Sequence, residues 1–471
     1  MKKRILFVII LLVSLAGLGL VIFFLSREEA KAPSLSASLK EEMEIDFIYN
    51  NGSASNIAFV TVRNNFSEYT MTGGENPVFT GYDDYPISIF YYLHFFEVSS
   101  RLVSQGFVTD EEANLSIFGL DPSRAQLFIQ TNDGRSVTLL VGSVSPDNNI
   151  YVKLDNSPAV YLASYFDLSI FMNDFRDLVD TALTPIAQMD QDDELVFDRI
   201  VFGGQAREEI VIVKNDFSGN NMNFSMSPYR IISPLTAASS MEHAEMYESL
   251  FGLYADRFVA KVSDNSGLSG YGLSSPWSTL ELVIEGESCK VLFSKPDNMG
   301  NVYACREGTS FIYEAASFNF PWLEITYFEL MEKMVILPFI DSVASIDIKS
   351  SARTVSFNLS GAGGRLTVKS GNTDIDTGIF RVFYQNLLSA RYDEYNDVPV
   401  NTSAFPFLEI IYNYRDRTKN ADTVSFFSTD SRRVLTSLNS GRAHYTLSIY
   451  TDQLLSDLDR VLSGERIRSF L

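Results

Sequence analysis

The sequence has few of the residues that most often build catalytic and metal sites. It contains two cysteines, two tryptophans and three histidines in 471 residues, which leaves little for a multi-histidine metal centre or a histidine-based triad. Positive charge is also scarce, because 37 lysines and arginines are set against 59 aspartates and glutamates, for a formal net charge of -22. An acidic chain without a basic stripe repels phosphate backbones. We therefore expect no nucleic-acid binding.

Aromatic residues are plentiful by contrast, with 36 phenylalanines and 23 tyrosines. Disordered chains carry few aromatic residues, so most of this chain is expected to bury hydrophobic cores. At roughly 150 residues per domain, its length allows about three domains.

The sequence has one long hydrophobic run, which lies near its start. Three basic residues precede an uncharged run, Ile5–Leu25, which as a helix would span roughly 31 Å, close to the thickness of a hydrocarbon core. The basic residues before the run and the two glutamates after it place residues 1–4 in the cytoplasm. We therefore expect a short cytoplasmic stub at 1–4, a transmembrane helix at 5–25 and a linker at 26–42.

A cleaved signal peptide is the alternative interpretation of this run. Ala30, Lys31 and Ala32 form a small-x-small pattern, but Pro33 would follow the cut and the run is longer than the usual signal core. An uncleaved anchor is favoured. The chain is then a single-pass protein of the cell membrane whose bulk is extracytoplasmic.

An internal repeat organises the rest of the chain. A Gly-Leu pair with a nearby proline opens it, and two tyrosines ten residues apart close it. In the first copy these residues are Gly119, Leu120, Pro122, Tyr151 and Tyr161. In the second copy they are Gly272, Leu273, Pro276, Tyr303 and Tyr313. A third, divergent copy lacks the glycine and begins near Pro406.

Each copy combines the same predicted elements. Short alternating strands joined by Asp-Gly or Glu-Gly turns predict an antiparallel meander with one apolar face. Two strands and a helix are expected before each meander. In the first copy they are the strands 57–62 and 67–72 and the helix 86–103; in the second, the strands 209–213 and 221–226 and the helix 241–259; in the third, the strands 343–348 and 354–359 and the helix 375–390. A second helix is expected after the first two meanders, at 165–180 and 321–334.

These elements together predict the fold class and the domains. We expect an α+β fold in which the N-terminal transmembrane helix is followed by three tandem repeats of antiparallel β-meander plus covering helices. The repeat domains are expected at 43–185, 186–338 and 339–471, the last being divergent.

The two cysteines each lie in a predicted strand of the second copy. A hairpin centred on Asp297 would place Cys289 and Cys305 opposite each other, where they could form a cross-strand disulfide in an extracytoplasmic compartment. Two unpaired cysteines in a core are the alternative.

The repeat resembles the bacterial "domain of unknown function 4340" family. The resemblance lies in the Gly-Leu opening, the Asp-Gly turn, the Val-Gly strand end and the Tyr-Val and Val-Tyr segments. The resemblance is best at 119–162 and looser at 272–313. Family members carry one N-terminal membrane helix and are grouped with gliding-motility-type ABC transporter auxiliary proteins. The resemblance therefore implies an ABC-type permease and ATPase as partners. It implies no catalytic residue, because the matching positions belong to turns and strands.

No motif in the sequence brings together reacting groups. The glycine cluster 361–364 lacks the Lys-Ser/Thr pair of a phosphate loop, Ser269 lacks the second glycine of a nucleophile elbow, and the acidic run 190–194 lacks the glycine of a calcium loop. We expect no enzyme, no cofactor and no metal, but a membrane-anchored extracytoplasmic accessory or scaffold protein of an ABC-type transport or gliding-motility-like complex. The alternative is a cell-envelope module that binds wall polymer or glycan through exposed aromatic residues.

Overall fold

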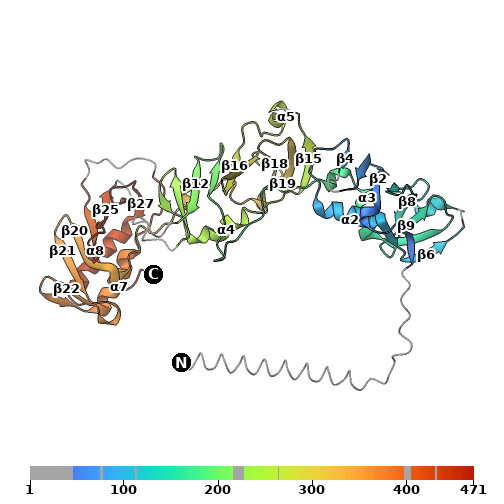
Figure 1. Cartoon of the computed structure of the whole chain (residues 1–471). Helices are drawn as coiled ribbons and strands as arrows, with labels where there is room; N and C mark the ends of the chain where they lie inside the picture. The colour runs from blue at the N-terminus through green and yellow to red at the C-terminus, as the bar shows by residue number, and fades with distance from the viewer. Residues whose placement is uncertain are drawn as a thin grey trace, which may run out of the picture. The chain divides into compact units, whose positions relative to one another are not determined.

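The computed structural model describes residues 46–74, 78–111, 114–215, 227–263, 265–396, 405–429 and 432–470. The chain divides into two compact units, one ending at Leu178 (unit 1) and one beginning at Val179 (unit 2). Both units consist mainly of antiparallel β-sheet with a smaller share of helix (Figure 1). No helix among the described residues is long and apolar enough to cross a membrane. The predicted stub, transmembrane helix and linker, residues 1–42, lie outside those residues.

Unit 1 is built around one eight-stranded antiparallel sheet. Its strands are ordered β4-β3-β2-β7-β8-β9-β10-β6. They comprise β2 (Ile57–Asn64), β3 (Glu68–Thr72), β4 (Val78–Thr80), β6 (Gly106–Thr109), β7 (Ala125–Thr131), β8 (Ser136–Val144), β9 (Asn149–Leu154) and β10 (Val160–Ser164). A separate pair is formed by β1 (Phe47–Asn50) and β5 (Arg101–Val103).

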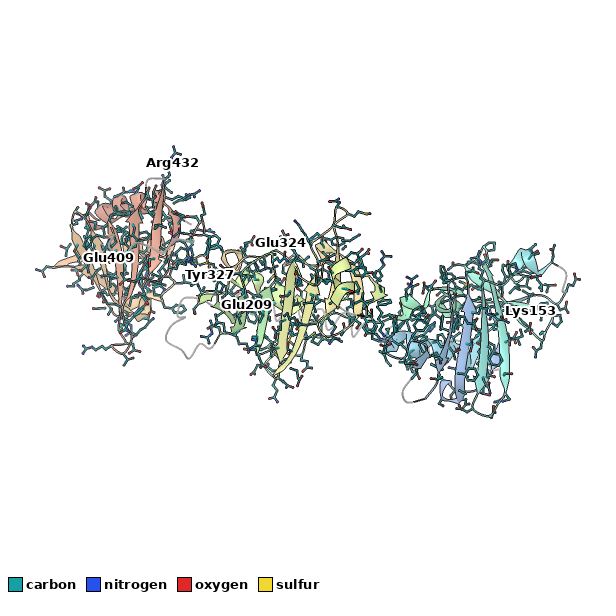
Figure 2. All side chains as sticks on the ribbon, turned by 90° about the horizontal axis from the view of Figure 1, so that it is seen from above. Lys153, Glu209, Glu324, Tyr327, Glu409 and Arg432 are labelled. Carbon is teal, nitrogen blue, oxygen red and sulfur yellow. The ribbon has the colours of Figure 1, made fainter. Side chains whose placement is uncertain are left out.

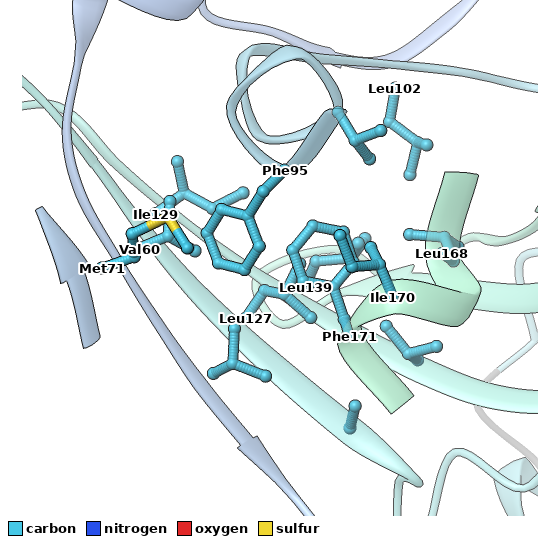
Figure 3. Packing of buried hydrophobic residues seen from close by; sticks show 14 of the residues in the cluster. Val60, Met71, Phe95, Leu102, Leu127, Ile129, Leu139, Leu168, Ile170 and Phe171 are labelled. Atoms are coloured by element: carbon cyan, nitrogen blue, oxygen red, sulfur yellow. The ribbon is translucent and has the colours of Figure 1, made fainter. Parts of the chain in front are cut away.

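Two helices cover the apolar face of this sheet. In β7 every second residue is buried, so Leu127 and Ile129 point to one face, as alternation along a strand requires. The helices α2 (Ile89–Ser100) and α3 (Tyr165–Met172) lie over that face. The rings of Phe95 and Phe171, one from each helix, lie 4.8 Å apart in the core between them and the sheet (Figure 3).

Unit 2 contains two further sheets. The nine-stranded sheet has the order β14-β13-β12-β11-β16-β17-β18-β19-β15. Its strands are β11 (Arg199–Gly203), β12 (Ile210–Lys214), β13 (Tyr229–Ser233), β14 (Ala237–Ala238), β15 (Arg257–Lys261), β16 (Ser278–Ile284), β17 (Glu287–Phe293), β18 (Asn301–Arg306) and β19 (Phe311–Ala316). Three short helices accompany it: α4 (Ala244–Ser249), α5 (Asn265–Gly270) and α6 (Tyr327–Leu330).

The last sheet has eight strands, in the order β23-β22-β21-β20-β24-β25-β26-β27. Its strands are β20 (Val343–Ser350), β21 (Thr354–Ser360), β22 (Thr367–Ser370), β23 (Thr373–Ile375), β24 (Leu408–Tyr414), β25 (Asp422–Ser428), β26 (Arg433–Leu438) and β27 (His444–Leu447). The helices α7 (Thr377–Leu388) and α8 (Ser448–Leu462) belong to this part of the chain.

The three sheets share the strand order at their centre, although the edge strands β6 and β15 have no counterpart in the last sheet. In each of them a strand of an N-terminal hairpin (β2, β11 or β20) pairs with the first strand of a four-stranded meander (β7, β16 or β24). The segment that contains α2, α4 or α7 lies between these two strands in the sequence. The predicted order of strand pair, helix and meander is therefore found in all three sheets.

Several predicted elements differ from those in the structure. The middle hairpin consists of β11 and β12, whereas the sequence predicted a pair of strands at 209–213 and 221–226. The first of these corresponds to β12, and 221–226 lies outside the described residues. Strand β11 shows no alternation because four of its five residues are buried, so its pattern does not look like a half-buried strand.

Several predicted helices were too long, including that at 165–180, where α3 ends at Met172, and two helices, α5 and α8, were missed. The helix expected at 241–259 ends with α4, and the residues after it form β15. The helix expected at 321–334 is reduced to α6. Helix α8, which follows the third meander, was not predicted.

Backbone hydrogen bonds join the two sheets of unit 2. Glu332 N–H donates to the carbonyl of Ala238 in β14 at 2.8 Å, and Tyr392 N–H donates to the carbonyl of Lys333 at 2.8 Å. Tyr445 N–H in β27 then donates to the carbonyl of Glu394 at 3.0 Å. The segments 331–335 and 390–394 therefore connect the edge of one sheet to the edge of the other.

Candidate functional site

The repeated Gly-Leu motif ends a short helical turn in both copies. Gly119 follows a 3-10 turn, Leu115–Phe118, and has a left-handed backbone with φ 67°. The N–H of Gly119 donates to the carbonyl of Ser116 and the N–H of Leu120 to that of Leu115, both at 3.1 Å. This pair of hydrogen bonds is a Schellman motif, which requires a left-handed residue and therefore favours glycine.

The second copy repeats this geometry after α5. Gly272 has φ 72°. Its N–H donates to the carbonyl of Ser269 at 3.1 Å, and the N–H of Leu273 donates to that of Leu268 at 3.0 Å. The leucines that follow the two glycines are buried, with 3% and 1% exposure. The glycine and leucine thus attach a helical turn to the sheet.

The motif tyrosines pack against equivalent aromatic residues. Tyr151 contacts Phe118 with ring centres 4.9 Å apart, and Tyr303 contacts Tyr271 at 5.0 Å. Tyr161 and Tyr313 pack in the same way, against Phe107 at 5.8 Å and Phe258 at 6.0 Å. The motif prolines, Pro122, Pro276 and Pro406, precede the first meander strands β7, β16 and β24. All these positions therefore have packing or turn roles.

Cys289 and Cys305 are both free thiols in the structure. Cys305 in β18 lies opposite Leu292 of β17, whereas Cys289 lies opposite Leu282 of β16 on the other side of β17. The predicted placement of the two cysteines opposite each other is wrong because the β17–β18 turn is not centred on Asp297. Burial raises the pKa of both thiols.

The acidic run 190–194 forms a local turn. The Asp190 carboxylate accepts the backbone N–H groups of Asp192 and Glu194, both at 2.9 Å. The Lys214 ammonium lies 3.3 Å from the Glu194 carboxylate. Within the described ranges, no group of three or more histidine, cysteine, aspartate or glutamate side chains is arranged to hold a metal ion.

The most unusual surface of unit 1 is an exposed apolar area on α2 and α3. It consists of Ile89, Phe90 and Leu93 of α2 and Phe166 of α3, which are 61–69% exposed. We call these four residues the α2–α3 apolar surface. His94 joins its two parts, because its Nε2 lies 3.2 Å from the carbonyl of Phe166 and the two rings are 4.9 Å apart.

Helix α2 is apolar over most of its surface, apart from the exposed Glu97 near its end, and only one side is covered. Phe95, Phe96 and Val98 are buried against the sheet. The helix is held in place by the Tyr49 hydroxyl, which donates to the carbonyl of Val98 at 2.7 Å, and by the N–H of Ser88, which donates to the carbonyl of Leu178 at 3.1 Å. A helix that is hydrophobic all round is normally buried on all sides. Its outer face is therefore fixed in position, and none of the residues that the structure describes covers it.

The size of this surface is typical of a binding site. With about 200 Å² per side chain, four residues at 61–69% exposure present roughly 500 Å². The largest apolar patch of an ordinary monomer is about 300–600 Å² and is often functional. The surface is large enough to form the centre of a standard interface of about 800 Å² per partner.

The sequence indicated the helix but not its exposed face. Tyr91, Tyr92, Phe95 and Phe96 fall at helical spacing and are more often core than a ligand platform. Phe95 and Phe96 are indeed buried, whereas Tyr91 is 37% exposed. Since large apolar residues occur on both sides of the helix, no periodic signal distinguishes its inner from its outer side.

The described residues thus define a protein of antiparallel sheets covered by helices, whose most prominent feature is an apolar surface. Residues 97–193 match the model of a family described as "Domain of unknown function (DUF4340)". This match confirms the resemblance at 119–162, while the looser resemblance at 272–313 lies beyond it. Comparison with curated proteins and with solved structures gave no match.

Proposed function

We propose that this chain is a non-enzymatic accessory or scaffold protein that binds a partner protein through the α2–α3 apolar surface. The exposed outer face of α2 carries this proposal. Three apolar side chains on one helix face, each more than 60% exposed, would be unfavourable in water unless another surface covers them in the working state.

The partner that we propose is the membrane-embedded permease of an ABC-type transport or gliding-motility-like complex. The resemblance to a family grouped with ABC transporter auxiliary proteins supports this choice. So does the hydrophobic run 5–25, which we propose as a transmembrane anchor with the bulk of the chain extracytoplasmic. Residues 26–45 could extend over at most about 70 Å. Unit 1 could therefore reach the exposed loops of a neighbouring membrane protein.

We also propose that the body consists of three tandem repeats, at 43–185, 186–338 and 339–471. The shared strand order of the three sheets supports this division. The Schellman motifs at Gly119 and Gly272 support the kinship of the first two copies. Repeats of one supersecondary unit provide long surfaces for partners, in keeping with a scaffold.

A cell-envelope module that binds glycan is the second possibility from the sequence, and the structure offers it less support. Sugar sites combine an aromatic ring with several polar groups that bind hydroxyls. Phe90 and Phe166 are instead accompanied by Ile89 and Leu93. An apolar protein surface fits this composition better.

The proposal is tested by purifying the tagged full-length chain from membranes solubilised in mild detergent. A nucleotide-binding subunit and its permease should be recovered with it. The double variant Phe90→Asp/Leu93→Asp should lose the permease. These side chains are 62% and 61% exposed, so the substitutions leave the core packing intact and the fold should be kept.

The expected loss follows from the area involved. Each of the two side chains presents about 120 Å², which corresponds to about 3 kcal/mol when it is fully buried at 25 cal/mol per Å². Half of that sum weakens binding by about a hundredfold. Phe318→Asp is the matched control, because Phe318 is 81% exposed but belongs to unit 2. Recovery of the chain alone, or equal recovery with all variants, would contradict the proposal.

A further inference from the structure

The chain reverses its direction after α8. This helix ends in a Schellman motif, in which the N–H of Gly464 donates to the carbonyl of Val461 at 3.1 Å and the N–H of Glu465 to that of Arg460 at 2.8 Å. The segment 465–470 has no regular secondary structure. It returns along α7 and α8, which lie side by side (Figure 1).

One asparagine binds the backbone of this segment. Asn386 belongs to α7, which packs on the last sheet, the sheet that contains Glu409 in Figure 2. Its side-chain amide donates to the carbonyl of Arg468 at 2.8 Å, and its Oδ1 accepts the N–H of Phe470 at 2.9 Å. In an extended chain a carbonyl and the N–H two residues later point to the same side, where a neighbouring strand would bind them. Asn386 therefore recognises main-chain groups, as proteins that bind peptides by adding a strand do.

Helix α8 fixes this asparagine in position. The Asn386 amide also donates to Asp457 Oδ2 at 3.0 Å, and the Gln453 amide donates to Asp457 Oδ1 at 3.0 Å. Asn386 and Asp457 are both fully buried, with 0% exposure. The groups that meet the segment are therefore preorganised. Because an unpaired buried polar group is costly, they favour a bound peptide backbone over none.

The ring of Phe470 occupies part of an apolar cavity. It lies 5.9 Å from the ring of Tyr450, edge to face, and the Tyr450 hydroxyl donates to the carbonyl of Leu387 at 3.0 Å. Both rings line a cavity of about 420 Å³ together with Leu447 and Ile449. These two side chains are still 46% and 71% exposed. A partner's side chain has room to cover more of this apolar surface than Phe470 covers.

The segment is much more exposed than the residues that bind it. Four of its six residues are exposed, and the other two, Ile467 and Phe470, are partly buried. Asn386 and Tyr450 are 0% and 8% exposed by contrast. Exposed segments that bury few apolar side chains open locally at a low free energy. The segment can therefore leave while α7 and α8 stay folded.

We propose that α7 and α8 form a peptide-binding groove, in which a segment of a partner protein exchanges with 465–470. We call Asn386, Leu447, Ile449 and Tyr450 the α7–α8 groove. The partner's segment presents a carbonyl and an N–H to Asn386 and places an aromatic side chain where Phe470 lies, because these are the contacts that the chain's own segment makes.

This proposal goes beyond the docking function proposed above and does not depend on it. The α2–α3 apolar surface belongs to unit 1 and the α7–α8 groove to unit 2. Either proposal can fail without the other.

The test uses an amidated, fluorescently labelled peptide with the sequence of residues 464–470, whose binding is measured by fluorescence anisotropy. Phe470→Ala in the full-length chain weakens the chain's own segment. This variant should bind the peptide at least about tenfold more tightly than the unchanged chain does, because the probe competes with a segment that has lost its partly buried ring. A peptide with alanine in place of its phenylalanine should bind at least about tenfold more weakly.

Backbone methylation of the peptide separates the role of Asn386 from general stickiness. N-methylation at the position of Phe470 removes the N–H that Asn386 binds and should weaken binding by at least about fivefold. N-methylation at the position of Ile467 is the matched control, because this N–H makes no hydrogen bond to any residue that the structure describes.

Three outcomes would overturn the proposal. They are no binding to Phe470→Ala at about 1 mM peptide, an equal loss from the two N-methylated peptides, and a dimer of the unchanged chain that the peptide dissociates. The last result would assign the groove to a second copy of this chain instead of a partner protein.

Discussion

Alanine at Gly119 should destabilise its sheet more strongly than alanine at Gly272 destabilises the equivalent one. Both glycines have a left-handed backbone, which costs any L-residue about 1 kcal/mol. At Gly119 a new Cβ would also lie 2.9 Å from the nitrogen and 3.0 Å from the Cβ of Ser143. At Gly272 the nearest atom, Cβ of Ser294, lies at 3.6 Å, an ordinary contact. Overpacking adds about 1–3 kcal/mol, so we expect about 2–4 kcal/mol at Gly119 and about 1 kcal/mol at Gly272.

Hydrogen exchange of the full-length chain measures both effects locally. Under conditions where exchange reports the equilibrium of opening, peptides of β7, β8 and β9 should exchange about 30- to 1,000-fold faster in Gly119→Ala. Peptides of β16, β17 and β18 should exchange only about fivefold faster in Gly272→Ala. Equal effects in the two variants would refute the argument that the close approach of Ser143, and not only backbone conformation, requires glycine at position 119.

Three further predictions follow from buried polar groups. Burial lowers the pKa of His444 to about 4, so the unfolded chain binds a proton at a higher pH than the folded chain does. The free energy of unfolding of unit 2 should therefore fall by up to about 3 kcal/mol between about pH 6.5 and about pH 4. Urea unfolding followed by tryptophan fluorescence should show a smaller fall in His444→Gln, and identical pH profiles would contradict the prediction. The buried Asn386 amide donates to Asp457 Oδ2 at 3.0 Å and to the carbonyl of Arg468 at 2.8 Å. Asn386→Ala should therefore lower the free energy of unfolding by about 2–3 kcal/mol and speed hydrogen exchange at 466–470. An unchanged urea midpoint would be evidence against this role. Both cysteines are free, so Cys289 and Cys305 should each take up iodoacetamide in denaturant without reductant; a mass spectrum with neither labelled would show that they are bonded.

Local sequence signals predicted the parts of the fold that local geometry determines. The Gly-Leu pairs at 119 and 272 mark turns whose backbone favours glycine, and a Glu-Gly turn predicted the hairpin in which Ile284 of β16 lies opposite Glu287 of β17. Strand β11 was missed because burial on both faces removes alternation. The cysteine register was wrong because the β17–β18 pairing, with Leu292 opposite Cys305, is centred between residues 298 and 299 rather than on Asp297.

The candidate sites were harder to predict because they depend on which surfaces remain uncovered. Phe90 and Phe95 belong to the same apolar helix, yet the first is 62% exposed and the second is buried. Only the positions of the sheet and α3 distinguish them. The α7–α8 groove brings Asn386 together with Tyr450 and with the segment 465–470. Segments so far apart in the sequence share no spacing that a motif could record.

The central claim is that the chain acts through a partner bound to the α2–α3 apolar surface, and photocrosslinking in intact membranes tests it most directly. p-Benzoylphenylalanine would replace Phe90 in one variant and Phe318, the exposed control residue in unit 2, in another. The account predicts that position 90 forms a crosslink to a permease subunit, identified by mass spectrometry, and that position 318 does not. Absence of a crosslink at position 90, or the same products from both positions, would contradict it.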